Sequence, residues 1–426
     1  MRYLLPYSNK LFSGILQTMD QKDLKDHKQI GQELELFFTD NIAPGAPFWL
    51  PKGMVIFKEL EKYIRELTEK AGYLETSTPI MVKSELFKQS GHWAKFGEHN
   101  MYNLSLSDED DGSNPQSYTL KPMNCPESTI LYRFRPRSYR ELPLRLSEIG
   151  RLHRREKSGE VNGLLRVRQL TMDDAHIYAT EDQISDEVSN ILDMMVNFYK
   201  LFGFEYDFRL ATRPETKAGT DEMWDKAEKA LSDVLDKKGI KAGDKLGDGA
   251  FYGPKIDVHI KDSQGREWQL ATVQLDFHQP EAFKLEYIDE TNTPKRPVMI
   301  HRAIFGSFER FIAILTEQYQ GTFPTWLSPI QVQIIPIADR HLEYAQNVLE
   351  QLKSANIRVA LDSRAEKMQA KIRDAQLQKI PYMLIIGDRE SSEGKVAVRK
   401  RDGNDLGAIE ISKIVDLIKS EVESKE

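Results

Sequence analysis

Residues 144–180 (LRLSEIGRLHRREKSGEVNGLLRVRQLTMDDAHIYAT) constrain the fold more than any other part of the chain. Charged residues recur at alternate positions in two segments, and Gly159 and Gly163 between them predict a turn that joins two strands. Side chains of a strand point alternately to its two faces, so residues of one parity share a surface. These residues are Gly150, Leu152, Arg154 and Glu156 in the first segment and Arg166, Arg168, Leu170, Met172, Asp174 and His176 in the second. The pattern predicts a charged sheet face, which either meets solvent or forms the floor of a site for a charged ligand.

Helix and strand patterns flank this stretch on both sides. The residues after Gly53 are amphipathic at helical spacing, with Gly72 as the expected C-cap, and residues 73–81 are rich in strand formers. Because Pro79 cannot donate to a ladder, we expect this strand at an edge or an interface, for which a dimer seam is one possibility. Residues 298–307 predict a strand that leads into a helix with Arg310 in its first turn.

The chain of 426 residues is too long for one typical domain. After a linker containing Gly321, Pro324 and Pro329, strands (332–337, 357–361, 382–386 and 396–399) alternate with helices (342–355, 367–379 and from 411). This alternation predicts a separate small α/β domain. We therefore expect an N-terminal extension at 1–24, a main domain at 25–322 and a C-terminal domain at 323–426.

The composition excludes several classes of protein. A content of 40% hydrophobic and 29% charged residues fits a soluble globular protein with a large core. The net charge of −7 gives no global signal for nucleic acid, although a local basic patch suffices for a structured RNA. Cys125 is the one cysteine, which excludes a disulfide framework and indicates a reducing compartment. No apolar run approaches the roughly 18 residues of a membrane span, so we expect a cytoplasmic protein with no membrane partner.

The order of these pieces resembles a class II aminoacyl-tRNA synthetase. Motif 1 would be the helix ending near Gly72 and the strand to Pro79, motif 2 the residues around Arg154-Arg155-Glu156, and motif 3 the segment Gly306–Arg310. More specific strings resemble the threonyl-tRNA synthetases from about residue 25 to the end: SGHW (90–93), KPMNCP (121–126), DDAH (173–176), FYGPKI (251–256), VQLDF (273–277), VMIHRA (298–303) and PTWL (324–327). We expect no counterpart of the family's amino-terminal editing region within these 426 residues.

The resemblance implies an α+β fold. Its catalytic domain would contain a mixed, mainly antiparallel class II synthetase sheet flanked by helices, followed by a C-terminal α/β anticodon-binding domain. It also implies an enzyme that joins L-threonine to tRNA(Thr) with ATP, as a homodimer through the motif 1 region.

The resemblance assigns roles to residues by motif. Arginine suits a site where phosphate and carboxylate charge must be neutralised, because its fork binds both and keeps its charge. The implied catalytic residues are Arg154, Arg310, His92 (the base near the tRNA ribose) and Lys255 (on the phosphate side). The implied ATP-binding residues are Arg154, Glu156, Arg166, Leu170, Gln269, Thr272 and Arg310, with Mg²⁺ accompanying the nucleotide. Met123, Met172, Asp174, Tyr252, Gln274 and Ala303 would bind the amino acid.

The resemblance also implies one Zn²⁺ per subunit, held in the amino acid pocket by Cys125, His176 and His301. Three ligands with an open position are typical of catalytic rather than structural zinc. Zinc would explain the choice of threonine over valine, since valine lacks the hydroxyl, and apolar contacts alone separate such pairs by only about 1–3 kcal/mol. From the residues alone, a buried inert thiol and two core histidines remain the alternative.

The chain departs from the family pattern at several positions. Leu170 stands where the family has a phenylalanine that stacks on adenine, and Met172 stands where it has a glutamine. Glu127-Ser128 replaces a Gly-His pair. In the C-terminal domain, Arg373, Glu390 and Arg399 match anticodon-contacting positions, whereas Ala365 replaces an asparagine. These changes affect the expected details of the pockets rather than the expected reaction.

Two other functions compete with threonine ligation. A sister enzyme for prolyl or seryl transfer would not need the Cys/His/His set. A catalytically reduced synthetase-like protein that binds RNA or regulates would tolerate Leu170 and Met172, although the three motif arginines speak for catalysis.

The sequence also generates a prediction about proofreading. Serine carries the same amino and hydroxyl groups as threonine, and no HxxxH motif of an editing site occurs in the chain. We therefore expect that these 426 residues do not hydrolyse Ser-tRNA(Thr), and that a separate trans-editing protein is a candidate partner. Rapid deacylation of purified Ser-tRNA(Thr) by the isolated chain would contradict this expectation.

Overall fold

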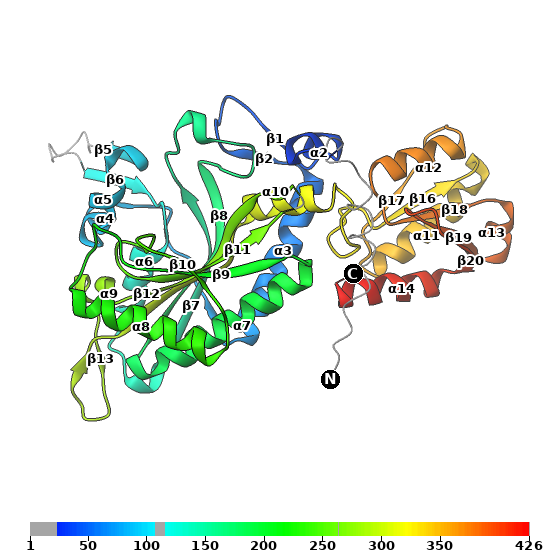
Figure 1. Ribbon diagram of the computed structural model, residues 1–426. Helices are drawn as coiled ribbons and strands as arrows, with labels where there is room; N and C mark the ends of the chain where they lie inside the picture. The colour runs from blue at the N-terminus through cyan, green and yellow to red at the C-terminus, as the bar shows by residue number, and fades with distance from the viewer. Residues whose placement is uncertain (1–23, 107–115, 263, 426) are drawn as a thin grey trace. The chain divides into compact units, whose positions relative to one another are not determined.

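The computed structural model describes residues 24–106, 116–262 and 264–425, so the predicted extension at 1–24 lies outside the described residues except for Leu24. These residues form two compact units. The large unit contains residues 39–47 and 61–313, and the small unit contains residues 24–38, 48–60 and 314–425. Helices α3 (Pro51–Lys70) and α10 (Phe308–Gln318) have residues in both units (Figure 1).

An eight-stranded mixed sheet organises the large unit. Its strand order is β10-β9-β11-β12-β15-β8-β7-β3, and all neighbours are antiparallel except the outer pairs β10–β9 and β3–β7. The strands are β3 (Leu74–Glu75), β7 (Leu144–His153), β8 (Gln169–Ala179), β9 (Tyr206–Ala211), β10 (Gly243–Lys245), β11 (Lys255–Lys261), β12 (Glu267–Asp276) and β15 (Val298–Ser307). The predicted pair of strands flanking a turn is therefore the β7–β8 pair.

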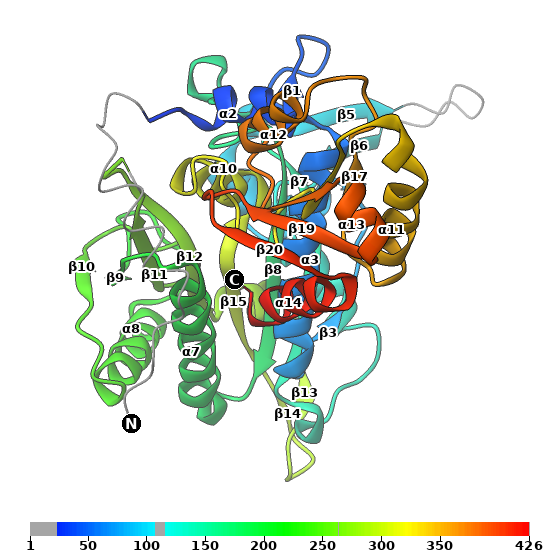
Figure 2. The ribbon, with the colours of Figure 1, turned by 90° about the vertical axis from the view of Figure 1, so that its right-hand side faces the viewer.

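Helices α7 (Ile184–Phe202) and α8 (Asp221–Lys237) pack side by side on one face of this sheet (Figure 2). Apolar residues recur along α7 at three- and four-residue spacing, as expected for a helix that covers a sheet. Its buried Phe198 stacks on Phe305 of β15 at 5.4 Å between ring centroids. Phe305 has the parity of His301, but the pairing of β15 with β8 is irregular between Ala303 and Ser307, so the predicted site residues His176 and His301 lie on the opposite face.

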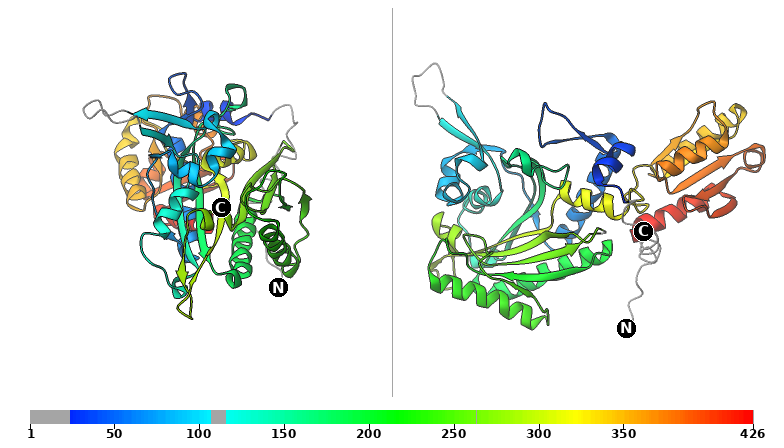
Figure 3. Two further views of the ribbon diagram at one scale, coloured as in Figure 1. Left: turned by 90° about the vertical axis from the view of Figure 1, so that its left-hand side faces the viewer. Right: turned by 45° about the horizontal axis from the view of Figure 1, so that its top comes forward.

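Smaller elements complete the large unit. Strands β4 (Met81–Lys83), β6 (Gln116–Leu120) and β5 (Tyr102–Leu106) form a separate sheet in that order. Short helices are α4 (Glu85–Gln89), α5 (His92–Phe96), α6 (Cys125–Tyr132) and α9 (His278–Ala282). Strands β13 (Tyr287–Ile288) and β14 (Pro294–Lys295) form a hairpin that projects from the unit (Figure 3).

The small unit contains a five-stranded sheet in the order β17-β16-β18-β19-β20. Its strands are β16 (Val332–Pro336), β17 (Val359–Leu361), β18 (Tyr382–Ile386), β19 (Lys395–Lys400) and β20 (Asp405–Glu410), and its helices are α11 (Leu342–Ser354), α12 (Met368–Leu377), α13 (Asp388–Glu393) and α14 (Ile411–Ser424). Near the N-terminus lie α2 (His27–Glu33) and the paired strands β1 (Phe37–Thr39) and β2 (Pro47–Trp49). The alternation of strands and helices predicted for the C-terminal region is confirmed.

The predicted α+β fold class is confirmed, but one strand differs from its prediction. Residues 73–81 form no single strand: β3 and β4 belong to different sheets, and Pro79 lies between them. The backbone N–H of Thr78 donates to the Glu148 carboxylate (3.0 Å) instead of to a ladder. None of the helices within the described ranges is long and apolar enough to cross a membrane.

Gly253 provides a test of how tightly β11 and β12 are joined. A Cβ built on Gly253 would lie 1.8 Å from the carbonyl oxygen of Leu275, so the Gly253→Ala substitution must displace backbone. We expect a loss of roughly 1–3 kcal/mol in the free energy of unfolding, as for other overpacked sites. Chemical denaturation would measure it, with Gly243→Ala as control because the nearest atom there is 3.8 Å away. Equal midpoints for both variants would contradict the close approach.

Candidate active site

Four central strands place polar residues in two rows on one face of the large sheet. The first row is His176 (β8), His301 (β15), Gln274 (β12) and Lys255 (β11), in which each residue is the register partner of the next. The second row is Asp174, Ala303, Thr272 and Asp257 on the same strands. Because the rows are two residues apart along each strand, both project from the same face.

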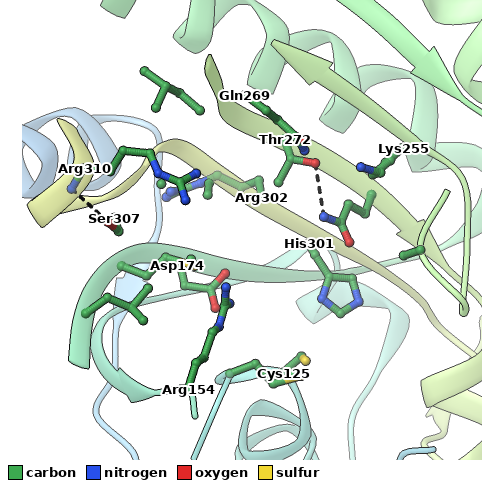
Figure 4. A pocket seen from close by; sticks show the side chains of 18 of the residues that line it. Cys125, Arg154, Asp174, Lys255, Gln269, Thr272, His301, Arg302, Ser307 and Arg310 are labelled. Carbon is green, nitrogen blue, oxygen red and sulfur yellow. Dashed lines mark hydrogen bonds between the residues drawn. The ribbon is translucent and has the colours of Figure 1, made fainter. Parts of the chain in front are cut away.

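A cavity of about 470 Å³ opens over this face (Figure 4). All residues predicted for catalysis and for the nucleotide, amino acid and metal sites lie in its wall, although up to 218 positions separate them in sequence. They are His92, Met123, Cys125, Arg154, Glu156, Arg166, Leu170, Met172, Asp174, His176, Tyr252, Lys255, Gln269, Thr272, Gln274, His301, Ala303 and Arg310. The wall also contains residues that no sequence motif marked, among them Lys95 and Asp248.

Cys125, His176 and His301 form a group that could hold a metal ion. One ligand atom from each lies within 4.8 Å of the others, and all three residues are buried. Cys125 enters from the start of α6, and Figure 4 shows its sulfur and the His301 ring pointing toward one another. A thiolate and two imidazoles are the donor set that zinc prefers. The residues therefore fit the zinc ion that the family resemblance implies.

Burial sets the protonation of this group. It lowers the pKa of His176 well below its usual value, which keeps the imidazole neutral, as a metal ligand must be. Burial also raises the pKa of the Cys125 thiol well above its usual value. A cation is thus needed to hold this sulfur as a thiolate.

Asp276 orients one of the two histidines. His301 Nε2 lies 2.9 Å from Asp276 Oδ2, and because a carboxylate only accepts, Nε2 carries the proton and Nδ1 keeps a free lone pair. Asp276 is fully buried, and it also accepts from the backbone N–H groups of His278 and Gln279. Burial opposes its charge, yet the hydrogen bond from His301 helps to hold the pKa of Asp276 below its usual value.

Three arginines of the wall, Arg154, Arg166 and Arg310, supply positive charge to the cavity. The Arg154 Nε donates to the Pro122 carbonyl (3.2 Å) and the Arg310 Nε to the Leu165 carbonyl (2.9 Å). Burial lowers the pKa of Arg310, and the neighbouring charge of Arg154 lowers it further. The negative charge of Glu156 partly offsets this effect on Arg310, and guanidinium groups gathered in one cavity form a site for an anion.

Arg166 is already paired. Its Nη2 lies 2.8 Å from Glu156 Oε2 and 2.9 Å from Glu160 Oε2, and its side chain is half exposed. Arg168, which shares its parity, is not in the cavity wall, since its guanidinium donates to the carbonyl groups of Glu156 and Pro44. The loop between β7 and β8 thus turns Arg168 away from the face predicted by strand alternation.

A chain of hydrogen bonds crosses the floor from β11 to the loop before it. Lys255 Nζ donates to Asp257 (2.6 Å), and Thr272 donates to the other oxygen of the same carboxylate (2.8 Å). Gln274 donates to Thr272 (3.1 Å) and accepts from the Tyr252 hydroxyl (2.6 Å). Asp257, which no sequence motif marked, therefore fixes both the lysine and the threonine of the site.

His92 lies beside the metal-binding group. Its Nε2 is 3.6 Å from the Cys125 sulfur and its Nδ1 is 2.8 Å from the Ser90 hydroxyl. Burial lowers the pKa of His92 to about 3, so the ring is neutral at pH 7.

The departures from the family pattern have identifiable surroundings. Leu170 packs with Leu152 and Val167 in an apolar cluster against which Met172 also packs. Glu127 is buried, burial raises its pKa to about 8, and neither of its carboxylate oxygens has a hydrogen-bond partner among the described residues. Its neighbour Ser128 lies 2.9 Å from the Tyr178 hydroxyl.

The residues predicted to contact the anticodon lie on three elements of the small unit. Arg373 projects from α12 with 77% of its side chain exposed. Glu390 in α13 accepts from the Gly387 backbone N–H (3.0 Å). Arg399 lies in β19, half-buried, with an Nε that has no partner in the described part of the chain.

Family models match both parts of the chain. Residues 105–319 match the tRNA synthetase class II core domain (G, H, P, S and T), and residues 331–421 match an anticodon binding domain.

Similar proteins and solved structures agree with this match. The threonine--tRNA ligases of Carboxydothermus hydrogenoformans and Caldanaerobacter subterraneus are 48% and 50% identical over 97% and 96% of this chain. The chain spans 64% and 62% of their length. The RNA binding domain of threonyl-tRNA synthetase from Cryptosporidium parvum has a TM-score of 0.89 at 39% identity, over 93% of this chain and 98% of that one. A putative threonyl-tRNA synthetase from Aeropyrum pernix has a TM-score of 0.79 at 28% identity, over 94% of this chain and 97% of that one.

These relatives confirm the resemblance that the motifs indicated. The chain belongs to the class II tRNA synthetase family, with the core domain of the G, H, P, S and T enzymes followed by an anticodon-binding domain.

Proposed function

We propose that the chain is a threonine--tRNA ligase, which activates L-threonine with ATP and transfers the threonyl group to tRNA(Thr). The observation that carries this proposal is that the Cys125, His176 and His301 group shares one cavity with the motif arginines. A ligand that bridges the two would present an amino acid to the metal side and phosphates to the arginine side. The named relatives support the same substrate.

Activation is the attack of a threonine carboxylate oxygen on the α-phosphorus of ATP, with pyrophosphate leaving. Arg154 would hold the carboxylate and the α-phosphate, and Arg310 would cover the adenine from the other side. Lys255, held by Asp257, would neutralise charge on the phosphate side. Glu156, Gln269 and Thr272 would contact the nucleotide, and Mg²⁺ would arrive with ATP.

Arg166 would bind the γ-phosphate, and to do so it must exchange partners. Its present ion pairs with Glu156 and Glu160 occupy the same donors. ATP would replace these carboxylates with a phosphate and free Glu156 to accept from the adenine amino group. Leu170 would give the adenine an apolar contact in place of an aromatic one.

The amino acid would lie on the metal side of the cavity. Zn²⁺ held by Cys125, His176 and His301 would bind the amino group and hydroxyl of threonine, and so discriminate against valine. The Asp174 carboxylate would accept from the amino group. The remaining contacts of this pocket would come from Met123, Met172, Tyr252, Gln274 and Ala303.

Transfer requires the tRNA ribose to attack the threonyl carbonyl, with AMP leaving. His92 is proposed as the base near this ribose because it lies in the wall of the same cavity. Arg373, Glu390 and Arg399 are proposed to read the anticodon, since splayed single-stranded bases are recognised by such donors and acceptors.

A homodimer through the motif 1 region is also part of the proposal. Leu74, Ile80 and Met81 are 59%, 42% and 46% exposed around this region, which leaves an apolar surface for a second copy. A cytoplasmic location and a separate protein that clears Ser-tRNA(Thr) remain predictions from the sequence.

Pyrophosphate exchange tests the first half-reaction. The purified chain is expected to catalyse ATP–pyrophosphate exchange with threonine, weakly with serine, and not with valine or proline. A zinc chelator should abolish the exchange because it removes the group that recognises the hydroxyl.

Three outcomes would contradict the proposal in different ways. Exchange with proline would indicate a sister enzyme. Full activity after verified metal removal would exclude zinc from substrate recognition. No exchange with any amino acid would favour a catalytically reduced RNA-binding or regulatory protein.

The Asp276→Asn substitution tests how the metal is held. Loss of the carboxylate that orients His301 is expected to weaken zinc binding by roughly 10–100-fold, as for comparable supporting residues. Competition with a chromophoric chelator measures the affinity, and cobalt substitution gives an absorption spectrum of the metal site that does not depend on activity.

Asp262→Asn is the matched control. Asp262 is a buried aspartate of the same unit that accepts from the backbone N–H groups of Gln264 and Arg266, away from the cavity. Its loss should reduce stability without changing zinc affinity. Equal loss of metal from both variants would show that Asp276 supports folding in general and does not specifically orient His301.

A further inference from the structure

Asn124, the residue before Cys125, does not line the cavity, but it contacts Asp174, which does. Its side chain is fully buried, and its Nδ2 donates to Asp174 Oδ2 at 3.0 Å. An ionised carboxylate can only accept, so the amide nitrogen must face Asp174. This hydrogen bond fixes one oxygen of the carboxylate that is proposed to bind the substrate amino group.

Gly150 of β7 provides the space in which this amide lies. A Cβ built on Gly150 would be 2.4 Å from Asn124 Oδ1 and 2.5 Å from Nδ2, which is far inside contact distance. The Gly150 backbone is not in the left-handed region, so its φ does not require glycine. The reason for glycine within this strand is therefore the close approach of another group.

The hydrogen bonding of the Asn124 side chain indicates that this residue does more than fill space. Its Oδ1 is buried and has no partner among the described residues, an arrangement that costs free energy. A side chain that only filled space would be better apolar, because it would leave no unpaired acceptor. The hydrogen bond from Nδ2 to Asp174 is the interaction that compensates for this cost.

We propose that Asn124 is a positioning residue that aims the Asp174 carboxylate at the amino group of the bound amino acid, and that Gly150 is required because it leaves room for Asn124. The inference rests on the proposed function, since it assumes that Asp174 binds the amino acid. It assigns a role to one residue of the KPMNCP string and to one residue of β7, neither of which lies in the cavity wall.

Three variants test this arrangement: Gly150→Ala, Asn124→Ala and the double variant. In Gly150→Ala the new methyl group must push the Asn124 amide aside, so both single variants should lose the same hydrogen bond. We expect each to raise the KM for threonine in pyrophosphate exchange by about ten- to a hundred-fold, the usual effect of losing a hydrogen bond to a charged group. The KM for ATP should change by less than about twofold.

The double variant gives the most specific result. Once Asn124 has been shortened to alanine, the methyl group at position 150 has space, so the double variant should be no worse than Asn124→Ala alone. Such non-additivity is expected for residues in contact and not for independent damage. Gly243→Ala, where an added Cβ makes only ordinary contact, is the glycine control and should behave as wild type.

Zinc content and thermal unfolding, measured on every variant, separate positioning from misfolding. Both should stay close to wild type while the KM for threonine rises. An additive double variant, an unchanged KM for threonine, or an equal rise in the KM for ATP would overturn the inference while leaving the proposed ligase intact. Wild-type protein without threonine-dependent exchange would instead overturn the proposed function and this inference with it.

Discussion

The register of β8, β15, β12 and β11 is the constraint on which the site depends. Strand side chains alternate between faces, so a slip of one residue between β8 and β15 would turn His176 away from His301 and remove Asp174 from the cavity. The Asp173 carboxylate secures this register. It accepts from the backbone N–H groups of Ile304 (2.7 Å) and Gly306 (2.8 Å), where the pairing of β15 with β8 shifts.

Consecutive residues of β15 show how one strand serves two environments. His301 and Arg302 both contribute to the cavity wall, but the guanidinium of Arg302 is buried, 4.6 Å from the centre of the Tyr73 ring, and donates to the Asp173 carbonyl (3.1 Å). Asp173 and Asp174 divide in the same way on β8, one toward the backbone of β15 and the other toward the cavity. On β8 and β15 the residues proposed for the site therefore alternate, and Asp173 and Arg302 between them link the two strands.

Strand periodicity makes much of this site predictable. Parity along β8 is enough to group Asp174 and His176, and the motifs and strings shared with the family add Arg166, Cys125 and His301, which periodicity cannot link. Strand periodicity and the family motifs do not predict the role or position of three kinds of residue. Asp257 and Asp276 act through other side chains, and nothing in a sequence marks a carboxylate as the support of a lysine or a histidine. Gly150 matters because it has no side chain, which leaves space for the Asn124 amide. The parity prediction for Arg168 is wrong because the chain leaves strand geometry after β7, and alternation has no meaning in a loop.

The two halves of the cavity differ in mechanical support. The proposed metal ligands and Asp174 are carried by hydrogen-bonded strands and a helix start, whereas Glu156 and Arg166 lie on the loop between β7 and β8. Residues of such a loop can exchange their hydrogen-bond and ion-pair partners at little cost in free energy, whereas residues in a β-ladder cannot. The proposed selectivity for the amino acid would thus depend mainly on residues held by strand pairing. Glu156 and Arg166, two of the residues proposed to contact the nucleotide, lie in a segment that can rearrange, so their positions can change without moving the groups proposed to choose the amino acid.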